Sequence, residues 1–253
     1  MQKQFTIKGK TFGGGRPVTC VPVVENSGFN AVNEIRRLVS EKVNMIEWRV
    51  DCLDDPADVS HITDILTSLK PVVKDTVLLF TFRTKKQGGR SDLDEKIILE
   101  LNDAAAKSGV VDIIDLEFFE ATNPKKEILR FQELGVHVIA SHHDFEQTPD
   151  DAVMKMLMNS MREGGADIVK LAVMPNCFDD VLRLMSVTDN MRKAFPTLPI
   201  VTISMGKLGL ISRLCGEVFG SCVTFGTLGR NSAPGQIDAK MLDTVLNIIH
   251  EVD

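Results

Sequence analysis

The fold of this chain is constrained most strongly by a repeated alternation of short β-branched runs with amphipathic helical patterns. Eight such runs occur, and their starts lie roughly 22 to 34 residues apart, which is the spacing of a βα unit. The runs cover residues 17–24, 44–51, 77–83, 110–118, 136–145, 167–174, 200–205 and 222–227. This order predicts an α/β fold, a (β/α)8 TIM barrel. An open doubly wound sheet usually has fewer strands, and no G-x-G-x-x-G motif follows the first run.

No linker-like segment divides the 253 residues, so residues 1–253 are expected to form a single catalytic domain. Residues 5–11 alternate apolar and polar side chains before Gly13-Gly14-Gly15. They predict a short N-terminal β-hairpin that closes the barrel bottom. Ser91 and Thr148 are expected to cap two of the helices, with Pro149 at the first helical position of the second. Ile237, Met241, Val245, Ile248 and Ile249 predict the buried face of a closing helix.

Charge and cysteine content narrow the functional classes. The net charge of −6 argues against a general nucleic-acid or anionic-membrane partner. No signal-peptide core and no apolar run of membrane-spanning length is present. The five cysteines are odd in number and form no C-x-x-C pair, which favours free thiols over disulfides or structural zinc. We therefore expect a cytoplasmic protein without a metal.

Lys170 is the most informative single residue, because it lies inside the apolar run Ile168-Val169-Lys170-Leu171-Ala172-Val173. A primary amine in a buried strand is costly unless its charge is relieved or used. Burial favours the neutral, nucleophilic amine, which can attack a ketone and form a Schiff base. The alternative, a lysine that protects an edge strand from aggregation, does not apply to a closed barrel.

Other polar side chains stand at the ends of predicted strands, where βα barrels carry their active sites. Glu47 and Arg49 share one face of the second strand, Arg83 ends the third, and His143 lies near the end of the fifth. Alternation excludes His142 from the face of Ser141 and His143. Each residue alone has a structural explanation, such as an ion pair between Glu47 and Arg49 or a packed histidine. Their joint occurrence with Lys170 favours one site.

A second polar cluster follows the last two strands. Arg213 lies in the apolar stretch Ile211-Ser212-Arg213-Leu214, and Ser232 and Gln236 belong to a Pro- and Gly-containing loop before the final helix. Guanidinium, hydroxyl and amide groups are donors suited to a carboxylate. The alternative for the loop is a turn followed by a helix cap.

At these residues the sequence resembles the type I 3-dehydroquinate dehydratase family over essentially the whole chain. The resemblance rests on Glu47-Trp48-Arg49-Val50-Asp51, Phe80-Thr81-Phe82-Arg83, Ser141-His142-His143-Asp144-Phe145, Lys170-Leu171-Ala172-Val173-Met174-Pro175, Ile211-Ser212-Arg213, Gly216-Glu217-Val218-Phe219-Gly220 and Ser232-Ala233-Pro234-Gly235-Gln236-Ile237. It implies a barrel enzyme, a homodimer without metal or organic cofactor. Its substrate would be 3-dehydroquinate, and it would catalyse the third step of chorismate biosynthesis.

The resemblance also implies a role for each site residue. Lys170 would form an imine with the C3 ketone, and His143 would move a proton from C2 to the departing C1 hydroxyl in a syn elimination. Arg213, Ser232 and Gln236 would hold the substrate carboxylate and a neighbouring hydroxyl, and Glu47, Arg49 and Arg83 the ring hydroxyls.

One departure from the family pattern concerns the histidine. Some members carry a glutamate after the third strand, thought to orient the histidine, where this sequence has Gln87. A neutral amide cannot stabilise an imidazolium by charge, so Asp115 or Glu117 is expected to supply that field. Two alternatives remain: a class I aldolase- or transaldolase-like lyase, and a catalytically silent barrel that binds a ligand.

Overall fold

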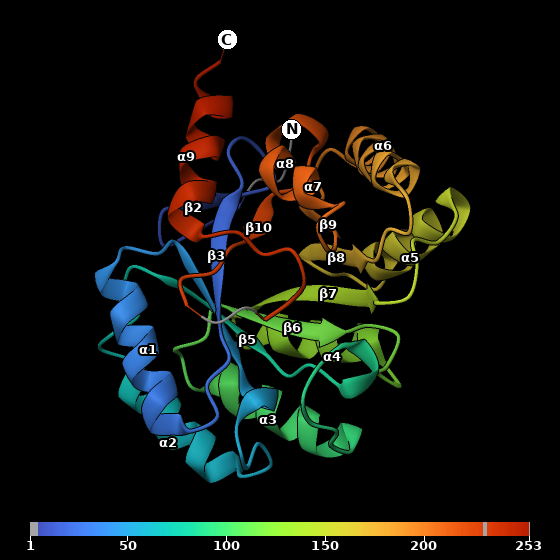
Figure 1. Ribbon diagram of the computed structural model, residues 1–253. Coiled ribbons are helices and arrows are strands. Elements are labelled where there is room, and N and C mark those ends of the chain that lie inside the picture. The colour runs from blue at the N-terminus through green and yellow to red at the C-terminus, as the bar shows by residue number, and fades with distance from the viewer. Residues whose placement is uncertain (1–4, 230–231, 253) are drawn as a thin grey trace.

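The structure is a computed structural model that describes residues 5–229 and 232–252. Eight parallel strands form the wall of a nearly closed barrel, and the helices surround it (Figure 1). The strands are β3 (Val18–Val23), β4 (Met45–Arg49), β5 (Val77–Thr81), β6 (Ile113–Glu117), β7 (His137–Asp144), β8 (Ile168–Val173), β9 (Ile200–Ser204) and β10 (Val223–Phe225). All eight predicted runs are therefore strands, and the barrel prediction is confirmed.

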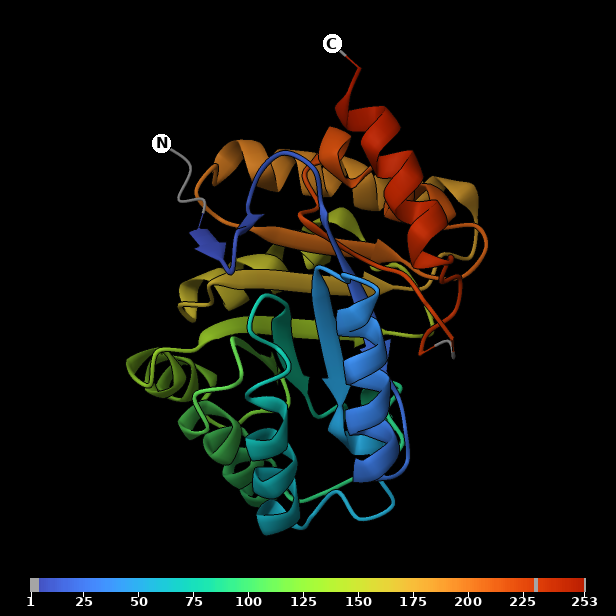
Figure 2. The same cartoon turned by 90° about the vertical axis from the view of Figure 1, so that its left-hand side faces the viewer.

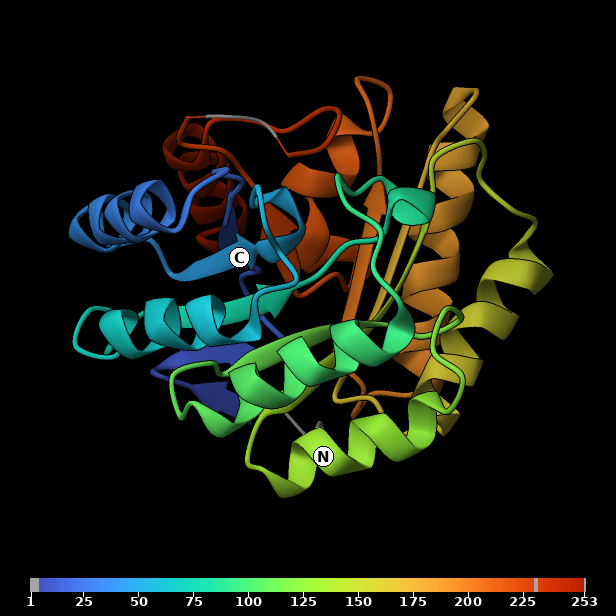
Figure 3. The ribbon, with the colours of Figure 1, turned by 90° about the horizontal axis from the view of Figure 1, so that it is seen from below.

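The helices follow the strands and lie outside them, as the view from below makes visible (Figure 3). They are α1 (Gly28–Ser40), α2 (Val59–Leu69), α3 (Glu95–Lys107), α4 (Pro124–Glu133), α5 (Asp151–Glu163), α6 (Phe178–Ala194), α7 (Leu210–Leu214), α8 (Gly216–Phe219) and α9 (Ala239–His250). Two short 3-10 turns, η1 (Val50–Cys52) and η2 (Lys85–Gln87), follow β4 and β5. Within the described residues, no helix has both the length and the apolar character that a membrane crossing requires.

The strand ladder is continuous from β10 through β3 to β9. Between β9 and β10 the described residues show one isolated bridge, Ile200 to Ser221, with a hydrogen bond of 2.8 Å from the Cys222 N–H to the Ile200 carbonyl. The barrel is thus closed by a short seam at this place.

The predicted hairpin is present as β1 (Phe5–Ile7) and β2 (Lys10–Phe12), which pair antiparallel. It lies at the end of the barrel where the strands begin (Figure 2). Phe12 is fully buried in the cluster of side chains that fills the barrel interior. Lys8 Nζ, in the turn, lies 2.7 Å from Asp112 Oδ2, directly before β6. The hairpin therefore covers the bottom, as expected.

Strand alternation separates two cores. Trp48 points outward from β4 and meets Phe80 of β5 edge to face, with ring centroids 5.6 Å apart, in the layer between strands and helices. Met45 and Leu79 point into the barrel and belong to the interior cluster. Towards the carboxyl ends of β4, β6 and β7 the inward positions are polar, whereas β8, β9 and β10 contribute Ala172, Ile203 and Phe225 there. The polar side chains therefore gather at one end of the barrel interior, beside an apolar wall.

Three expectations about the helices are wrong in detail. α3 has its N-cap at Asp94, because the Ser91 hydroxyl donates to the Asp51 carbonyl instead. α5 has its N-cap at Asp150, because the Thr148 hydroxyl donates to the Met174 carbonyl. α9 begins after Ile237 and buries Ala239, Leu242 and Leu246, so Met241 and Ile248 face solvent.

Candidate active site

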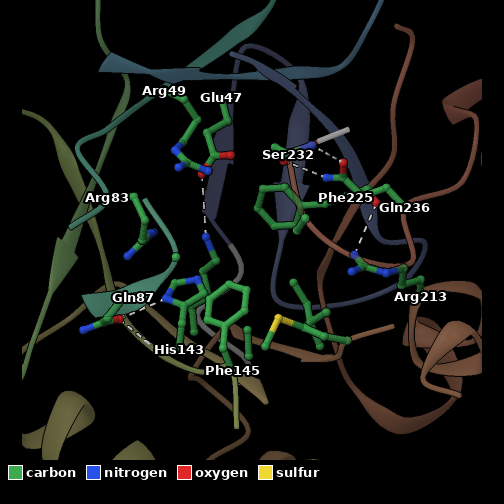
Figure 4. Close-up of a pocket in the computed structure, with 16 residues that line it drawn as sticks. Glu47, Arg49, Arg83, Gln87, His143, Phe145, Arg213, Phe225, Ser232 and Gln236 are labelled. Carbon is green, nitrogen blue, oxygen red and sulfur yellow. Dashed lines mark hydrogen bonds and ion pairs between the residues drawn. The ribbon is translucent and has the colours of Figure 1, made fainter. Parts of the chain in front are cut away.

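A pocket opens at the carboxyl ends of the strands, and polar residues from both predicted clusters line it (Figure 4). All eight residues predicted for the site belong to the lining: Glu47, Arg49, Arg83, His143, Lys170, Arg213, Ser232 and Gln236. The other lining residues are Gln87, Gly88, Phe145, Ala172, Ile203, Met205, Phe225 and Ala233. This mixture of apolar walls with a few polar groups is typical of small-molecule sites.

Lys170 points from β8 into this pocket and is 3% exposed. Its Nζ lies 3.1 Å from Asp115 Oδ2, 3.7 Å from Glu47 Oε1 and 4.6 Å from the centre of the Phe225 ring. The sequence argument considered burial alone, whereas the folded site gives the amine two carboxylate neighbours. The carboxylates hold the amine in place at the pocket wall.

Asp115, on β6, connects the amine to a buried arginine. Its Oδ1 lies 2.8 Å from Arg83 Nη2 and accepts a hydrogen bond of 2.6 Å from the Ser141 hydroxyl. Burial raises the pKa of Asp115, but Arg83 and Lys170 outweigh it and lower the pKa to about 2. Asp115 is therefore an anion throughout the neutral range.

Arg83 and Arg49 have separate carboxylate partners. Arg83 Nη1 donates to Glu117 Oε1 at 2.9 Å, and Arg49 binds Asp51 bidentately at 2.7 and 2.8 Å. Burial lowers the pKa of both guanidinium groups, but the facing carboxylates outweigh it and leave both raised. The ion pair of Arg49 is thus with Asp51, while Glu47 accepts a hydrogen bond from Thr81 and faces Lys170.

His143 lines the pocket and His142 does not, in agreement with the alternation along β7. β7 pairs with β8 so that Ser141 stands opposite Lys170, and His143 lies two residues further towards the carboxyl end. Burial, then the positive charges of Arg83 and Lys170, hold the pKa of His143 well below its usual value. His142 instead meets the Phe119 ring edge to face. A neutral imidazole, suited to accept a proton, therefore faces the pocket.

Gln87 is held beside His143 by a tight turn. Gly88 follows it with φ +85°, and a Cβ there would lie 2.3 Å from the ring of Phe145. Gln87 Oε1 accepts a hydrogen bond of 2.9 Å from the His143 N–H and lies 3.1 Å from His143 Nδ1. Neither Asp115 nor Glu117, the acids expected to serve the histidine, has a hydrogen bond to it among the described residues. Both acids are directed at Arg83, and the stabilisation of the imidazolium by their charge stays a prediction.

Arg213 lies on the opposite side of the pocket from Arg83 and Gln87, close to Gln236 (Figure 4). Its guanidinium donates to backbone carbonyls at Pro234 (2.9 Å) and Phe225 (3.4 Å), and its Nε has no hydrogen-bond partner among the described residues. Burial alone lowers the pKa of Arg213 to about 10. Among the described residues this buried cation at the pocket wall has no carboxylate partner, and a guanidinium fork matches the geometry of a carboxylate.

Ser232 and Gln236 complete this side of the pocket and hold each other in place. The Ser232 N–H donates to Gln236 Oε1 at 2.8 Å, and Gln236 Nε2 donates to the Ser232 hydroxyl at 2.9 Å. Ser232 Oγ is thus the acceptor in this second hydrogen bond. Among the described residues, no cluster of three or more His, Cys, Asp or Glu side chains is arranged to hold a metal ion.

Sequence comparison gives matches over almost the whole chain. The family model described as type I 3-dehydroquinase matches residues 19–253. The 3-dehydroquinate dehydratase of Clostridioides difficile strain 630 is 38% identical over 252 residues, which cover 99% of both chains. The 3-dehydroquinate dehydratase of Bacillus subtilis strain 168 is 39% identical over 248 residues, covering 98% of this chain and 97% of the relative.

Solved structures give the same result. A crystal structure of type I 3-dehydroquinate dehydratase from Clostridium difficile, with covalently modified comenic acid, superposes with a TM-score of 0.94 at 38% identity and 99% coverage of both chains. The 3-dehydroquinate dehydratase of Geobacillus kaustophilus also superposes with a TM-score of 0.94, at 32% identity, covering 98% of this chain and 96% of that one.

Proposed function

Because this chain belongs to the type I 3-dehydroquinase family and is a 3-dehydroquinate dehydratase, a hydro-lyase of the shikimate pathway, we propose that it removes water from 3-dehydroquinate through an imine at Lys170. The observation that carries this proposal is the position of Lys170, a buried amine that opens into a pocket shared with His143 and Arg213. The family assignment leaves no support for an aldolase-like lyase or a silent barrel.

The reaction begins at the ketone. The Lys170 ammonium first gives one proton to His143, and the resulting amine attacks C3 of 3-dehydroquinate. The imidazolium returns that proton to the hydroxyl of the adduct, which leaves as water and gives a protonated imine. The imine withdraws electrons from C2, so the C2–H bond becomes acidic enough for a histidine to break. Asp115 and Glu47 lie close enough to the nitrogen to stabilise its positive charge.

His143 carries the proton. Its imidazole takes the C2 proton, the resulting enamine expels the C1 hydroxyl, and the imidazolium returns the proton so that water leaves. One group acts at both carbons, so the elimination is syn. Water then hydrolyses the conjugated imine, frees 3-dehydroshikimate and restores the Lys170 amine. The low pKa of His143 supports a base that is unprotonated at neutral pH.

Substrate orientation is divided between the two sides of the pocket. We assign the carboxylate to Arg213, with Ser232 and Gln236 on the same group and a neighbouring hydroxyl. We assign the ring hydroxyls to Glu47, Arg49 and Arg83. The absence of a carboxylate partner for Arg213 among the described residues supports the first assignment, since an anion is needed to offset its burial.

We further propose that residues 1–253 work as one catalytic domain, as a homodimer and in the cytoplasm. The five thiols, all free, support a reducing compartment. The imine itself supplies the electron sink, so we expect the steps to need no cofactor, and activity to survive chelators. Light scattering on the purified protein checks the dimer, and a molar mass near one chain would contradict it.

The imine is tested by trapping. Borohydride added together with 3-dehydroquinate should inactivate the enzyme irreversibly and leave a mass increment on the peptide that contains Lys170. Lys170→Met is the matched control, because it keeps the length of the side chain and removes the nucleophile. It should form no adduct and no conjugated enone absorbance. An adduct on another lysine would refute the assignment.

A further inference from the structure

Gln87 contacts His143 twice through one atom, and this fixes which atom it is. The backbone N–H of His143 is a donor, so the amide atom 2.9 Å from it must be the oxygen, Oε1. The same oxygen lies 3.1 Å from His143 Nδ1. An oxygen accepts and cannot donate, so Nδ1 must carry a hydrogen. The neutral imidazole is therefore the Nδ1–H tautomer, and Nε2 has the free lone pair.

The other end of the amide meets a carboxylate. Gln87 Nε2 donates to Glu120 Oε1 at 3.3 Å, and Glu120 Oε2 lies 2.8 Å from Lys86 Nζ. Glu120 follows β6, three residues beyond Glu117, and its side chain is 24% exposed. A carboxylate only accepts hydrogen bonds, so it opposes a flip of the amide that would turn Nε2 towards the histidine. If the amide flipped, its Nε2 group, which is a donor, would face the His143 N–H, which is also a donor.

We propose that Glu120 is a positioning residue for the proton shuttle: it orients the Gln87 amide, which in turn selects the Nδ1–H tautomer of His143. This inference rests on the proposed function, in which Nε2 of that tautomer accepts the C2 proton. In this arrangement the Glu120 carboxylate does not contact the imidazole directly. The Gln87 amide lies between them and forms one hydrogen bond to each. The neutral amide in between transmits orientation without placing a charge against the ring.

The other charged groups around His143 do not provide this orientation. Arg83, Lys170 and Arg49 act on the imidazole through their positive charge, and His142 lies next to it in β7. All of them disfavour its protonation, and none of them has a hydrogen bond to its ring among the described residues. The hydrogen bond from Nδ1 to Gln87 is the contact that distinguishes the two ring nitrogens.

The first test measures the tautomer directly. Long-range proton–nitrogen NMR distinguishes a protonated from an unprotonated ring nitrogen, and the His143 signals are assigned by their loss in His143→Ala. In the wild type at neutral pH we expect Nδ1–H, and in Glu120→Ala a mixture of both tautomers. An Nε2–H tautomer in the wild type, or the same tautomer in both proteins, would overturn the inference.

The second test separates positioning from general structure. Glu120→Ala should lower kcat on the order of tenfold, with KM and the yield of borohydride-trapped imine nearly unchanged, because only the proton transfer is impaired. Glu34→Ala is the matched control, since Glu34 also pairs with a basic side chain, Arg37, and its own side chain is 27% exposed. It should keep the wild-type kcat. Equal kcat in Glu120→Ala and Glu34→Ala would refute the inference.

A rescue variant completes the test. Gln87→Glu alone would place a carboxylate 3.3 Å from Glu120, and the repulsion should lower kcat. Adding Glu120→Ala removes the repulsion and leaves a carboxylate that accepts directly from Nδ1. The double variant should therefore exceed Glu120→Ala in kcat, and a double variant no faster than that single one would contradict the inference. If the wild type forms no imine, the proposed function fails, whereas the NMR result still decides the tautomer.

Discussion

The carboxylate of Asp115 joins Lys170 to Arg83: one oxygen lies 3.1 Å from the lysine amine and the other 2.8 Å from the guanidinium. Asp115 lies on β6, Lys170 on β8 and Arg83 two residues after β5, and each is at most 3% exposed. Two buried cations therefore share one anion at the centre of the proposed site. Several properties of the enzyme depend on this arrangement.

Asp115→Asn should destabilise the protein as well as the reaction. Removing the charge leaves both cations without their shared partner, and breaking a buried pair costs roughly 3–5 kcal/mol. Denaturant unfolding at pH 7 measures the loss. Asp189→Asn, which breaks a surface pair on α6, is the control and should cost less than about 1 kcal/mol.

The difference in unfolding free energy between wild type and Asp115→Asn should change with pH in a definite direction. The pKa of Asp115 is lowered to about 2 in the folded protein, so its stabilisation is complete above its unfolded pKa, about 4, and disappears as the pH falls to about 2. The gap in unfolding free energy between wild type and Asp115→Asn should narrow over this window. A gap that stays constant from pH 5 to 2 would mean that the charge of Asp115 is not its origin.

Substitution of the two neighbouring histidines should give opposite results. His143→Ala should still accumulate the imine but turn over about 10² to 10⁴ times more slowly, since it lacks the proton shuttle. His142→Ala should retain most of the activity, because His142 packs on Phe119 outside the pocket. Single-turnover kinetics with each variant distinguish imine formation from elimination. The reverse pattern would assign the proton shuttle to His142.

Arg213 should read the substrate carboxylate. Arg213→Lys keeps the charge but loses the bidentate geometry, so we expect it to be impaired, and Arg213→Ala more so, by roughly 2–5 kcal/mol in kcat/KM. An analogue with a neutral amide in place of the carboxylate sharpens the test. Wild type should discriminate strongly against it and Arg213→Ala only weakly. Equal discrimination would transfer the role to Ser232 and Gln236.

Arg213 should lower the stability of the folded protein when no ligand is bound. Burial alone lowers the pKa of Arg213 from 12.5 to about 10, which corresponds to a cost on the order of 3 kcal/mol below pH 10. Arg213→Met should therefore unfold at a denaturant concentration equal to or above that of wild type. A substrate analogue with a carboxylate should stabilise wild type and leave Arg213→Met unchanged. A large loss of stability in Arg213→Met would contradict this interpretation.

The acid limb of kcat/KM should lie at low pH. His143 must be unprotonated to take the C2 proton, and burial together with Arg83 and Lys170 holds its pKa well below 6.5. As the pH falls, kcat/KM should remain flat through pH 6.5 and decline only below it. An acid limb centred at or above pH 6.5 would be inconsistent with the buried imidazole described above.

The sequence predicted those parts of the site that depend on strand periodicity. Glu47, His143 and Lys170 were found because inward positions near the ends of parallel strands converge in a barrel. Asp115 lies in such a strand too, and its charge within the apolar run of β6 was the same kind of signal as Lys170. Its partners, however, depend on which side chains meet across the barrel, and periodicity does not encode that.

Other features depend on tertiary contacts that local sequence does not show. Ser91 and Thr148 have good capping side chains, yet both donate to distant carbonyls in the folded chain. Glu120 gave no signal, because it lies beyond the strand and reaches the histidine only through Gln87. Sequence patterns therefore indicate which residues face the pocket, whereas the pairing of charges and hydrogen bonds requires the three-dimensional structure.

The seam between β9 and β10 is the place where few ladder hydrogen bonds join neighbouring strands of the barrel. Arg213, Ser232 and Gln236 follow these two strands, whereas His143 and Lys170 lie on the continuous ladder of β7 and β8. Local opening requires less free energy where fewer ladder hydrogen bonds must break, so amide hydrogens of β10 should exchange with solvent well before those of β7. We therefore expect the side of the pocket that carries Arg213 to open locally more often than the side that carries Lys170 and His143.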